Sequence, residues 1–318
     1  KVLKQESTKT RKYFTFVDAL YLYGEYCKTS RNLRNATINS IYKAIRTLQN
    51  GHLKKEYILK DMNFDDFEEI KMSLLQKMSP YTININYLSV IKQTLRLCKR
   101  KELIFSIPDI DRCRIDEKKE IKYLTIPQIH KVLKLAKKDM AQAGKTLTRH
   151  QAQLRPQRLY WSIAILAHSG MRPRELRTLK YTDLLFSDKR NPKIRIHDTA
   201  FNKRGRVMPI STRLMKTLKS MPRFNSIYVD PYYKWNPNNF CNDIQRLRKV
   251  YKIGFAVSPA IFRPSFATYL AAIGGLSPFE IQAYLGHKDI ESTMCYVNIN
   301  AVNHNSSIAS KINNLKTA

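Results

Sequence analysis

Hydrophobic residues recur at spacings of three and four through most of the chain, the pattern of amphipathic helices. Two such stripes lie in the first hundred residues: Ile38, Ile41, Tyr42, Ile45 and Leu48, then Leu88, Ile91, Leu95 and Cys98. Ser79 and Pro80 mark the start of the second helix, because a hydroxyl can cap a helix and a proline suits its first position. The pattern predicts at least four helices between about residues 16 and 103.

The helical period is lost at 104–122, where a proline and many charges are typical of a linker. It returns at LTIPQIHKVLKLAKK, where Thr125 can cap a helix and Pro127 lies in its first turn. We therefore expect a helical domain at 1–105, a linker at 106–123 and a second domain at 124–318. Within the second domain, 140–158 is polar and lacks a clear period, which predicts an exposed loop or a frayed helix.

Strand-like alternation of apolar and polar residues is confined to one stretch of the second domain. KIRIHDTAF alternates over 194–197, NKRG has the composition of a turn, and RVMPI can form the partner strand. This predicts a hairpin at 193–210 with Lys203 near its tip. The expected fold class is mainly α, with two domains and a small antiparallel β-sheet in the second.

The charge of the chain indicates which class of molecule it binds. The sequence has 57 Lys and Arg against 25 Asp and Glu, a formal net charge of +32. Such an excess destabilises a compact protein through self-repulsion unless a polyanion is bound, so nucleic acid is the leading partner. Ribosomal proteins and membrane-surface proteins are also basic, so charge alone does not identify a DNA enzyme.

Other classes of protein and site are disfavoured by what the sequence lacks. It has no run of about 18 apolar residues, and KVLKQESTKTRKYF has no signal-peptide segment, so we expect a cytoplasmic or nuclear protein without a membrane partner. The five cysteines form no CxxC pair and the seven histidines no HxxxH pattern. We therefore expect a reducing compartment, no metal and no cofactor.

Two arginines stand at predicted helix starts. In HSGMRPREL a glycine turn precedes Arg172 and Pro173 opens the helix, and in FRPSFATYLAAIGG Arg263 precedes Pro264. A guanidinium held at a rigid helix start can bind a phosphate through two donors. Arg172 could instead be a surface arginine in a charged turn, the commoner role of this residue type, and Arg263 could be a structural arginine that neutralises nearby carboxylates at a turn.

His287 follows a tight turn near the C-terminus. SPFEIQAYLGH predicts a helix with a capping box formed by Ser277 and Glu280 and a stop at Gly286. A histidine at such a turn is more often structural than catalytic.

Tyr296 lies in the next predicted helix, nine residues after His287. Ile290, Met294 and Val297 fall within about 60° of one another around this helix, whereas Tyr296 lies roughly 120° away. We expect those three residues on the buried face and Tyr296 outside it, although Tyr296 could still contact a neighbouring segment.

Together these stretches resemble the tyrosine recombinase, or phage integrase, family. Its catalytic domain carries an arginine in a TGxRxxEL-like segment, a hairpin lysine, HxxR, LGH and a tyrosine nine residues beyond the LGH histidine. The matching positions, in the same order, are Arg172 in SGMRPREL, Lys203 in NKRG, Arg263 in AIFR, His287 in LGH and Tyr296 in CYVN. The match covers 124 to about 300, and the N-terminal domain resembles the core-binding domain of the family only in size, helicity and charge.

The resemblance implies a site-specific DNA recombinase that cleaves and rejoins strands through a 3′-phosphotyrosine. Tyr296 would be the nucleophile, and Arg172 and Arg263, with His287, would stabilise the extra negative charge of the pentacovalent state without a metal. Lys203 would protonate the leaving 5′-oxygen. The implied partners are double-stranded DNA, a homotetramer on paired sites, and accessory DNA-bending or directionality proteins.

Further basic residues are expected to contact DNA. They are Lys99, Arg100 and Lys101 at the end of the second stripe, and Arg204 and Arg206 beside Lys203. The sequence leaves open which basic residue of 203–206 is the general acid.

One position departs from the family pattern. Ala260, in SPAIFRPSFAT, stands where the family usually has the histidine of HxxR, or sometimes a lysine. Alanine can neither accept a proton nor bind phosphate. Either this is a natural variant in which water or another side chain substitutes, or it is a deliberate change that slows the reaction.

Two other functions fit the same residues. A type IB topoisomerase would use similar chemistry to relax supercoils as a monomer. A non-enzymatic relative would bind DNA with a steep dependence on salt and leave no covalent adduct.

Overall fold

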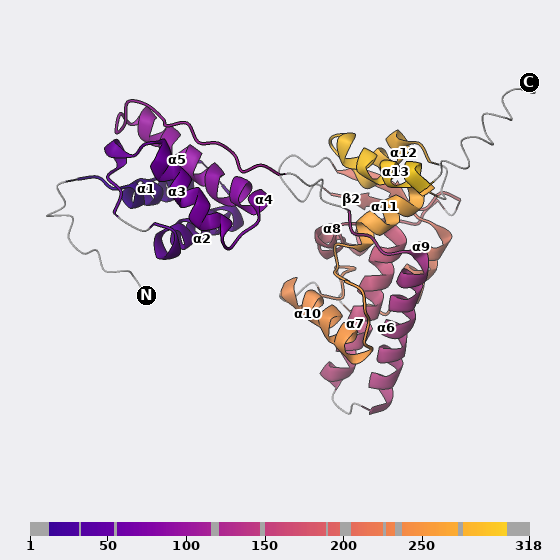
Figure 1. Cartoon of the computed structure of the whole chain (residues 1–318). Coiled ribbons are helices and arrows are strands. Elements are labelled where there is room, and N and C mark those ends of the chain that lie inside the picture. Colours follow the sequence, from indigo (N-terminus) through magenta and orange to yellow (C-terminus); the bar gives the residue numbers. More distant parts are fainter. Residues whose placement is uncertain are drawn as a thin grey trace, which may run out of the picture. The chain divides into compact units, whose positions relative to one another are not determined.

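The computed structural model describes residues 13–31, 33–53, 56–115, 121–146, 150–188, 190–197, 205–224, 227–232, 237–272 and 276–303. They form two compact units, one within 1–119 and the other within 120–318 (Figure 1). Each unit has a large hydrophobic core of its own. None of the helices in these ranges is long and apolar enough to cross a membrane.

The N-terminal unit is helical, as predicted. Its helices are α1 (Phe16–Thr29), α2 (Asn35–Gly51), α3 (Phe64–Leu75), α4 (Pro80–Thr82) and α5 (Ser89–Arg100). A π-helical stretch, Ile83–Leu88, joins α4 to α5, and a short 3-10 turn at Leu59–Asp61 precedes α3. The predicted start at Ser79 is confirmed, because its side chain accepts a hydrogen bond from the Thr82 N–H and Pro80 takes the first helical position.

Part of the expected linker lies against this unit. Ile110 and Cys113 are buried in its core. Asn84, in the π-helical stretch, donates to the Cys113 carbonyl over 2.9 Å and accepts the Cys113 N–H over 2.8 Å. Two buried side chains and a two-point amide contact therefore fix a segment that lacks any helical period, and the expected linker of 106–123 does not begin at residue 106.

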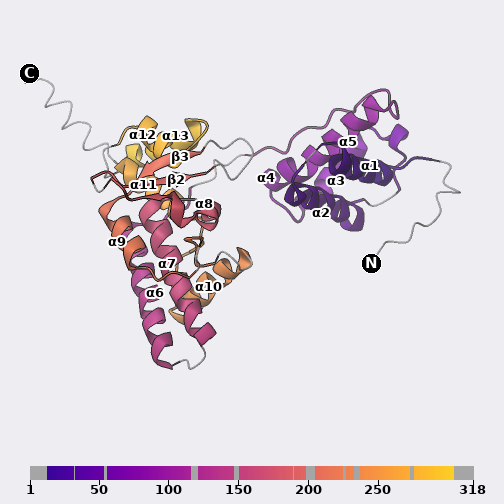
Figure 2. The same cartoon turned by 180° about the vertical axis from the view of Figure 1, so that it is seen from behind.

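The C-terminal unit is built around two long helices that lie side by side (Figures 1 and 2). Its helices are α6 (Ile126–Thr146), α7 (His150–Ser169), α8 (Pro173–Thr178), α9 (Thr212–Ser220), α10 (Pro237–Val250), α11 (Phe262–Ala272), α12 (Pro278–Leu285) and α13 (Glu291–Asn303). In both views α11, α12 and α13 gather at one end of the α6 and α7 pair. The predicted site residues Arg263, His287 and Tyr296 belong to these helices and the turn between them.

The segment 140–158 is not a loop where the structure describes it. Helix α6 continues to Thr146, and α7 begins at His150 and runs through Pro156. Its polar side chains bind α10 and the residue after it: Arg155 pairs with Asp243, and Gln142 accepts a 2.8 Å hydrogen bond from Tyr251. The missing apolar period reflects these polar contacts between helices, so the prediction of a loop was wrong for 140–146 and 150–158.

The predicted hairpin is present and gains a third strand. Strands β1 (Leu184–Leu185), β2 (Lys193–Ile196) and β3 (Arg206–Pro209) form an antiparallel sheet in that order. Ile194 lies opposite Met208, and both are fully buried. β1 was not predicted, because two residues are too few to show an alternation of apolar and polar positions. The hairpin tip, with Lys203 and Arg204, lies outside the described residues.

Candidate active site

A buried carboxylate, Glu175 in the first turn of α8, lies at the centre of the site. Only 5% of its side chain is exposed. Its Oε1 accepts hydrogen bonds from Nη1 of Arg172 over 2.8 Å and from Nη1 of Arg206 over 2.9 Å. Its Oε2 accepts the Arg172 N–H over 2.9 Å and Nη2 of Arg206 over 3.0 Å. Nη1 of Arg263 lies 3.8 Å from Oε2, so three guanidinium groups surround one carboxylate.

The charge of this cluster favours an anionic ligand. Burial alone would raise the pKa of Glu175, but the hydrogen bonds and charge of Arg206, followed by the Arg172 N–H and Arg263, lower it to about 2. Glu175 is therefore ionised at neutral pH. Three arginines against one carboxylate leave two positive charges in excess, which can stabilise a phosphate.

Arg172 is held at the N-cap of α8, as HSGMRP predicts. Gly170 has a φ of +63°, and a Cβ there would lie 2.5 Å from the ring of Phe266. Only glycine fits this turn, because the backbone is left-handed and a side chain would clash. About a quarter of the Arg172 side chain is exposed, which leaves it accessible to a ligand.

Arg263 is the second residue of α11 and is almost fully buried. Its Nη1 donates to the Gly170 carbonyl over 3.1 Å and its Nη2 to the Leu285 carbonyl over 2.6 Å. It thereby joins the turn before α8 to the end of α12. Burial and then the charge of Arg172 lower the pKa of Arg263 to about 10, so the group remains protonated at neutral pH.

His287 is placed by the predicted turn. Gly286 ends α12 in the left-handed conformation with φ +67°, and the capping box of Ser277 and Glu280 is present at the other end of the helix. Nδ1 of His287 lies 2.8 Å from Oγ1 of Thr293. Burial, then the positive charges of the site arginines, lower the pKa of His287 to about 4. The imidazole is therefore neutral at neutral pH.

Tyr296 lies against His287. The two rings stack with their centroids 6.1 Å apart and their planes inclined by 27°. Burial and then Cys295 raise the pKa of Tyr296 more than Arg263 and Arg172 lower it. The phenol of the free protein is therefore protonated and must lose its proton to act as a nucleophile.

The buried face of α13 differs from the predicted one. Thr293 is fully buried, whereas Ile290, Met294 and Val297 are only partly buried. Tyr296 follows Thr293 by three residues, so both lie on the same side of the helix. Tyr296 is half-buried and contacts the small cluster of Ala267, Ile281 and Leu285. The prediction failed because α13 contacts both α11 and α12, which helical phase alone does not show.

Residues 122–302 match the sequence model of the phage integrase family, which is more than half of the chain. The chain belongs to the phage integrase family. No curated protein matches the sequence.

Solved structures of similar fold include two integrases and a site-specific recombinase, each bound to DNA. A lambda integrase dimer bound to a COC′ core site is 15% identical in sequence and superposes with a TM-score of 0.68. The match covers 89% of this chain and 95% of the lambda integrase chain. XerH recombinase on a palindromic difH substrate shares 16% identity and a TM-score of 0.68, covering 91% and 84%. The Tn1549 transposon integrase with a circular intermediate DNA shares 18% identity and a TM-score of 0.64, covering 87% and 94%. At these sequence identities the similarity shows a common fold and nothing more.

The structure describes some of the remaining positions of the phage integrase pattern and leaves others out. Ala260 is exposed in the turn before α11, three residues ahead of Arg263. Lys203 and Arg204 lie outside the described residues. Arg206 was expected to contact DNA, but only 10% of its side chain is exposed, and its guanidinium binds Glu175 and the Tyr284 carbonyl. That placement makes it part of the site's framework.

The sequence patterns did not reveal the importance of Glu175, the carboxylate in the first turn of the helix that Pro173 opens. The spacing of three from Arg172 is that of a capping box, in which a side chain at the third helical position accepts the N-cap N–H. That signal could have identified the contact with Arg172, but not the approach of Arg206.

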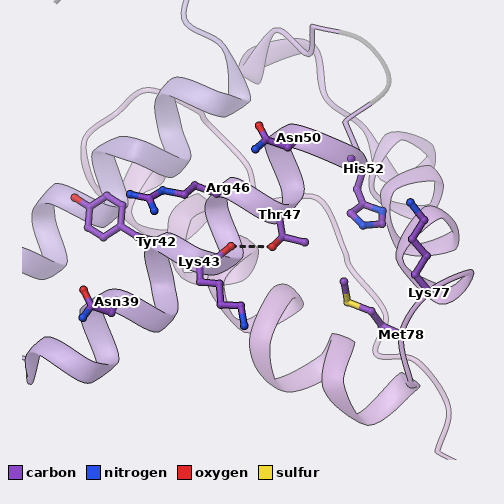
Figure 3. A pocket seen from close by; sticks show the side chains of 10 residues that line it. Asn39, Tyr42, Lys43, Arg46, Thr47, Asn50, His52, Lys77 and Met78 are labelled. Carbon is purple, nitrogen blue, oxygen red and sulfur yellow. Dashed lines mark hydrogen bonds between the residues drawn. The ribbon is translucent and has the colours of Figure 1, made fainter. Parts of the chain in front are cut away.

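The N-terminal unit of this phage integrase family member has a basic pocket of its own, of about 630 Å³. Figure 3 shows side chains of α2, including Lys43, Arg46 and Asn50, on one side, and His52, Lys77 and Met78 on the other. Lys43, Arg46 and Lys77 are exposed, whereas His52 is buried with Nδ1 2.9 Å from Oγ of Ser73. The expected DNA contacts Lys99, Arg100 and Lys101 are also exposed, at the end of α5.

Proposed function

We propose that this chain is a site-specific DNA recombinase that breaks and rejoins strands through a 3′-phosphotyrosine. The observation that carries the proposal is Tyr296 stacked on His287 beside arginines whose charge exceeds that of the buried Glu175. A phosphodiester under attack passes through a pentacovalent state with extra negative charge, which such a cluster stabilises. Membership of the phage integrase family and the DNA complexes of similar structures support the same substrate.

The reaction exchanges one phosphate ester for another. The phenolate oxygen of Tyr296 attacks phosphorus, the bond to the 5′-oxygen breaks, and a 3′-phosphotyrosine forms. Arg172 and Arg263 bind the non-bridging oxygens, and neutral His287 donates a hydrogen bond to one of them. A 5′-hydroxyl from a second strand then reverses the step, so the bond energy is retained and no ATP is required.

Two protons must move in the cleavage step. The raised pKa of Tyr296 requires a base to accept the phenolic proton, and Ala260 provides none. The leaving 5′-oxygen requires a proton in return, and Lys203 is the proposed donor.

Ala260→His should accelerate cleavage if the missing base limits the rate. The position is exposed, so an imidazole can be accommodated there without displacing the core. General acid–base catalysis typically contributes about 10²–10⁴-fold, and we expect an increase of at least ~10-fold in the single-turnover rate. Ala260→Gln is the matched control, because it adds a polar side chain without a titratable base. An unchanged or lower rate for Ala260→His would mean that the site has another proton acceptor.

The proposed assembly is a homotetramer that pairs two double-stranded sites. A lambda integrase of similar fold forms a tetramer on a Holliday junction. With DNA as its substrate, the proposed place of action is the cytoplasm.

The basic pocket on α2 and the end of α5 are proposed to bind the DNA backbone. Each phosphate neutralised changes the slope of log K against log salt by about 0.9 for duplex DNA. Lys43→Gln should therefore flatten this slope by roughly 0.9, and the double change with Arg46→Gln by about twice that, if each side chain neutralises one phosphate. Lys28→Gln on α1 is the control, since Lys28 already lies 3.7 Å from Glu25. Equal slopes for all these proteins, measured by fluorescence anisotropy, would show that the pocket does not contact DNA.

The direct test of the proposed function is covalent trapping. The protein is incubated with nicked substrates made from its own flanking genomic DNA, and the trapped peptide is sequenced by mass spectrometry. A DNA adduct on Tyr296 is the expected result. Relaxation of a two-site plasmid without recombination would indicate topoisomerase activity, and salt-sensitive binding without an adduct would indicate a non-enzymatic relative.

A further inference from the structure

Arg206 of β3 joins three elements of the active site. Its Nη1 and Nη2 donate to the two carboxylate oxygens of Glu175 in α8, over 2.9 and 3.0 Å. Its Nε donates to the Tyr284 carbonyl in α12 over 2.8 Å. One guanidinium therefore connects α8, which Arg172 caps, to α12, which ends two residues before His287.

The turn before His287 is shaped around this arginine. A Cβ on Gly286 would lie 2.9 Å from Cδ of Arg206 and 3.1 Å from its Nη1. The absence of a side chain at Gly286 lets Arg206 pass close to the backbone. The position of the LGH turn and that of Arg206 therefore depend on each other.

Glu175 could otherwise compete with the substrate. A carboxylate and a phosphate bind the same two-pronged face of an arginine, so Glu175, which already accepts a hydrogen bond from Nη1 of Arg172, would hold Arg172 and Arg263 more strongly if its charge were not neutralised. Arg206 contacts both carboxylate oxygens at once. With Arg206 in place the three arginines exceed Glu175 by two charges, and without it the excess would fall to one.

We infer that Arg206 is a positioning residue that neutralises Glu175 and so leaves Arg172 and Arg263 available to the scissile phosphate. The inference rests on the proposed recombinase function. It assigns Arg206 no contact with the substrate, because the side chain acts through Glu175.

The test compares three variants in single-turnover cleavage of a nicked DNA substrate at saturating protein. Arg206→Gln should lower the rate by about 10²-fold, the scale seen when one stabilising donor is lost. Arg206→Lys keeps the charge and should retain at least ~10-fold more activity than Arg206→Gln. Adding Glu175→Gln to Arg206→Gln removes the uncompensated carboxylate and should restore at least ~10-fold of the rate. A purely structural role for Arg206 predicts the opposite, because the double variant loses still more contacts.

Controls separate this inference from the proposed function. Arg195→Gln removes the same charge from the exposed side of β2 and should cleave like the unaltered protein. A titration of the Glu175 carboxyl group by ¹³C NMR does not depend on catalysis. In Arg206→Gln this titration should show the pKa of Glu175 raised from about 2. If the unaltered protein forms no adduct, the recombinase proposal fails, and the NMR titration still tests the neutralisation of Glu175. Full activity in Arg206→Gln, a double variant no faster than Arg206→Gln, or an unchanged Glu175 pKa would each overturn the inference.

Discussion

Tyr296→Phe is expected to abolish the covalent protein–DNA complex on a nicked substrate. Removal of a covalent nucleophile costs several orders of magnitude, so adduct formation should fall by at least ~10³-fold. Phenylalanine keeps the ring that stacks on His287 and contacts the cluster of Ala267, Ile281 and Leu285. Only the phenolic oxygen, the proposed nucleophile, is lost, and the fold and DNA affinity should persist. The adduct is measured as a slower band on a denaturing gel.

Tyr269→Phe is the matched control for this variant. Tyr269 lies on α11 of the same unit and is 40% exposed, so it offers a second accessible phenol. It should form the adduct at the rate of the unaltered protein, and all three proteins should bind DNA with the same affinity. An adduct that persists in Tyr296→Phe would show that a different residue attacks the phosphate.

Features that depend on neighbours within a few residues could be predicted from the sequence. Ser79 and Pro80 start a helix, Ser277 and Glu280 form a capping box, and Gly286 takes the left-handed turn. In each case a side chain or a backbone angle satisfies a group at most four residues away. The placement of Arg172 at a helix start and of His287 after a turn followed from these local rules.

Features that depend on distant contacts could not be predicted in this way. Arg206 lies 31 positions from Glu175 and 78 from Tyr284, so no local pattern indicates that they meet. The sequence therefore suggested Arg206 as a DNA contact. The burial of Thr293 was missed for a related reason: the helical period fixes which residues share a face, but the neighbouring helices determine which face is buried.

Arg263 has structural contacts and a proposed role in binding the scissile phosphate, and we expect substitution to separate the two. Arg263→Gln removes charge-assisted hydrogen bonds to the carbonyls of Gly170 and Leu285, which are worth about 1.5–3 kcal/mol each. The free energy of unfolding should fall by roughly 3 kcal/mol, because some of this loss is recovered when the site relaxes. The cleavage rate at saturating DNA should fall by about 10²–10³-fold, the cost of one preorganised donor to a transition-state oxygen.

Arg263→Lys distinguishes the two roles. An ammonium group keeps the charge, but it lacks the planar fork that reaches both carbonyls and a phosphate oxygen. Part of the lost stability should return, whereas cleavage should stay at least ~10-fold below that of the unaltered protein. Arg172→Lys is the companion variant, because a quarter of the Arg172 side chain is exposed and its guanidinium pairs with Glu175, only three residues away. It should lose activity with little change in thermal stability. Cleavage at the unaltered rate by Arg263→Lys would show that this guanidinium holds the fold and does not bind the phosphate, leaving Arg172 as the principal ligand.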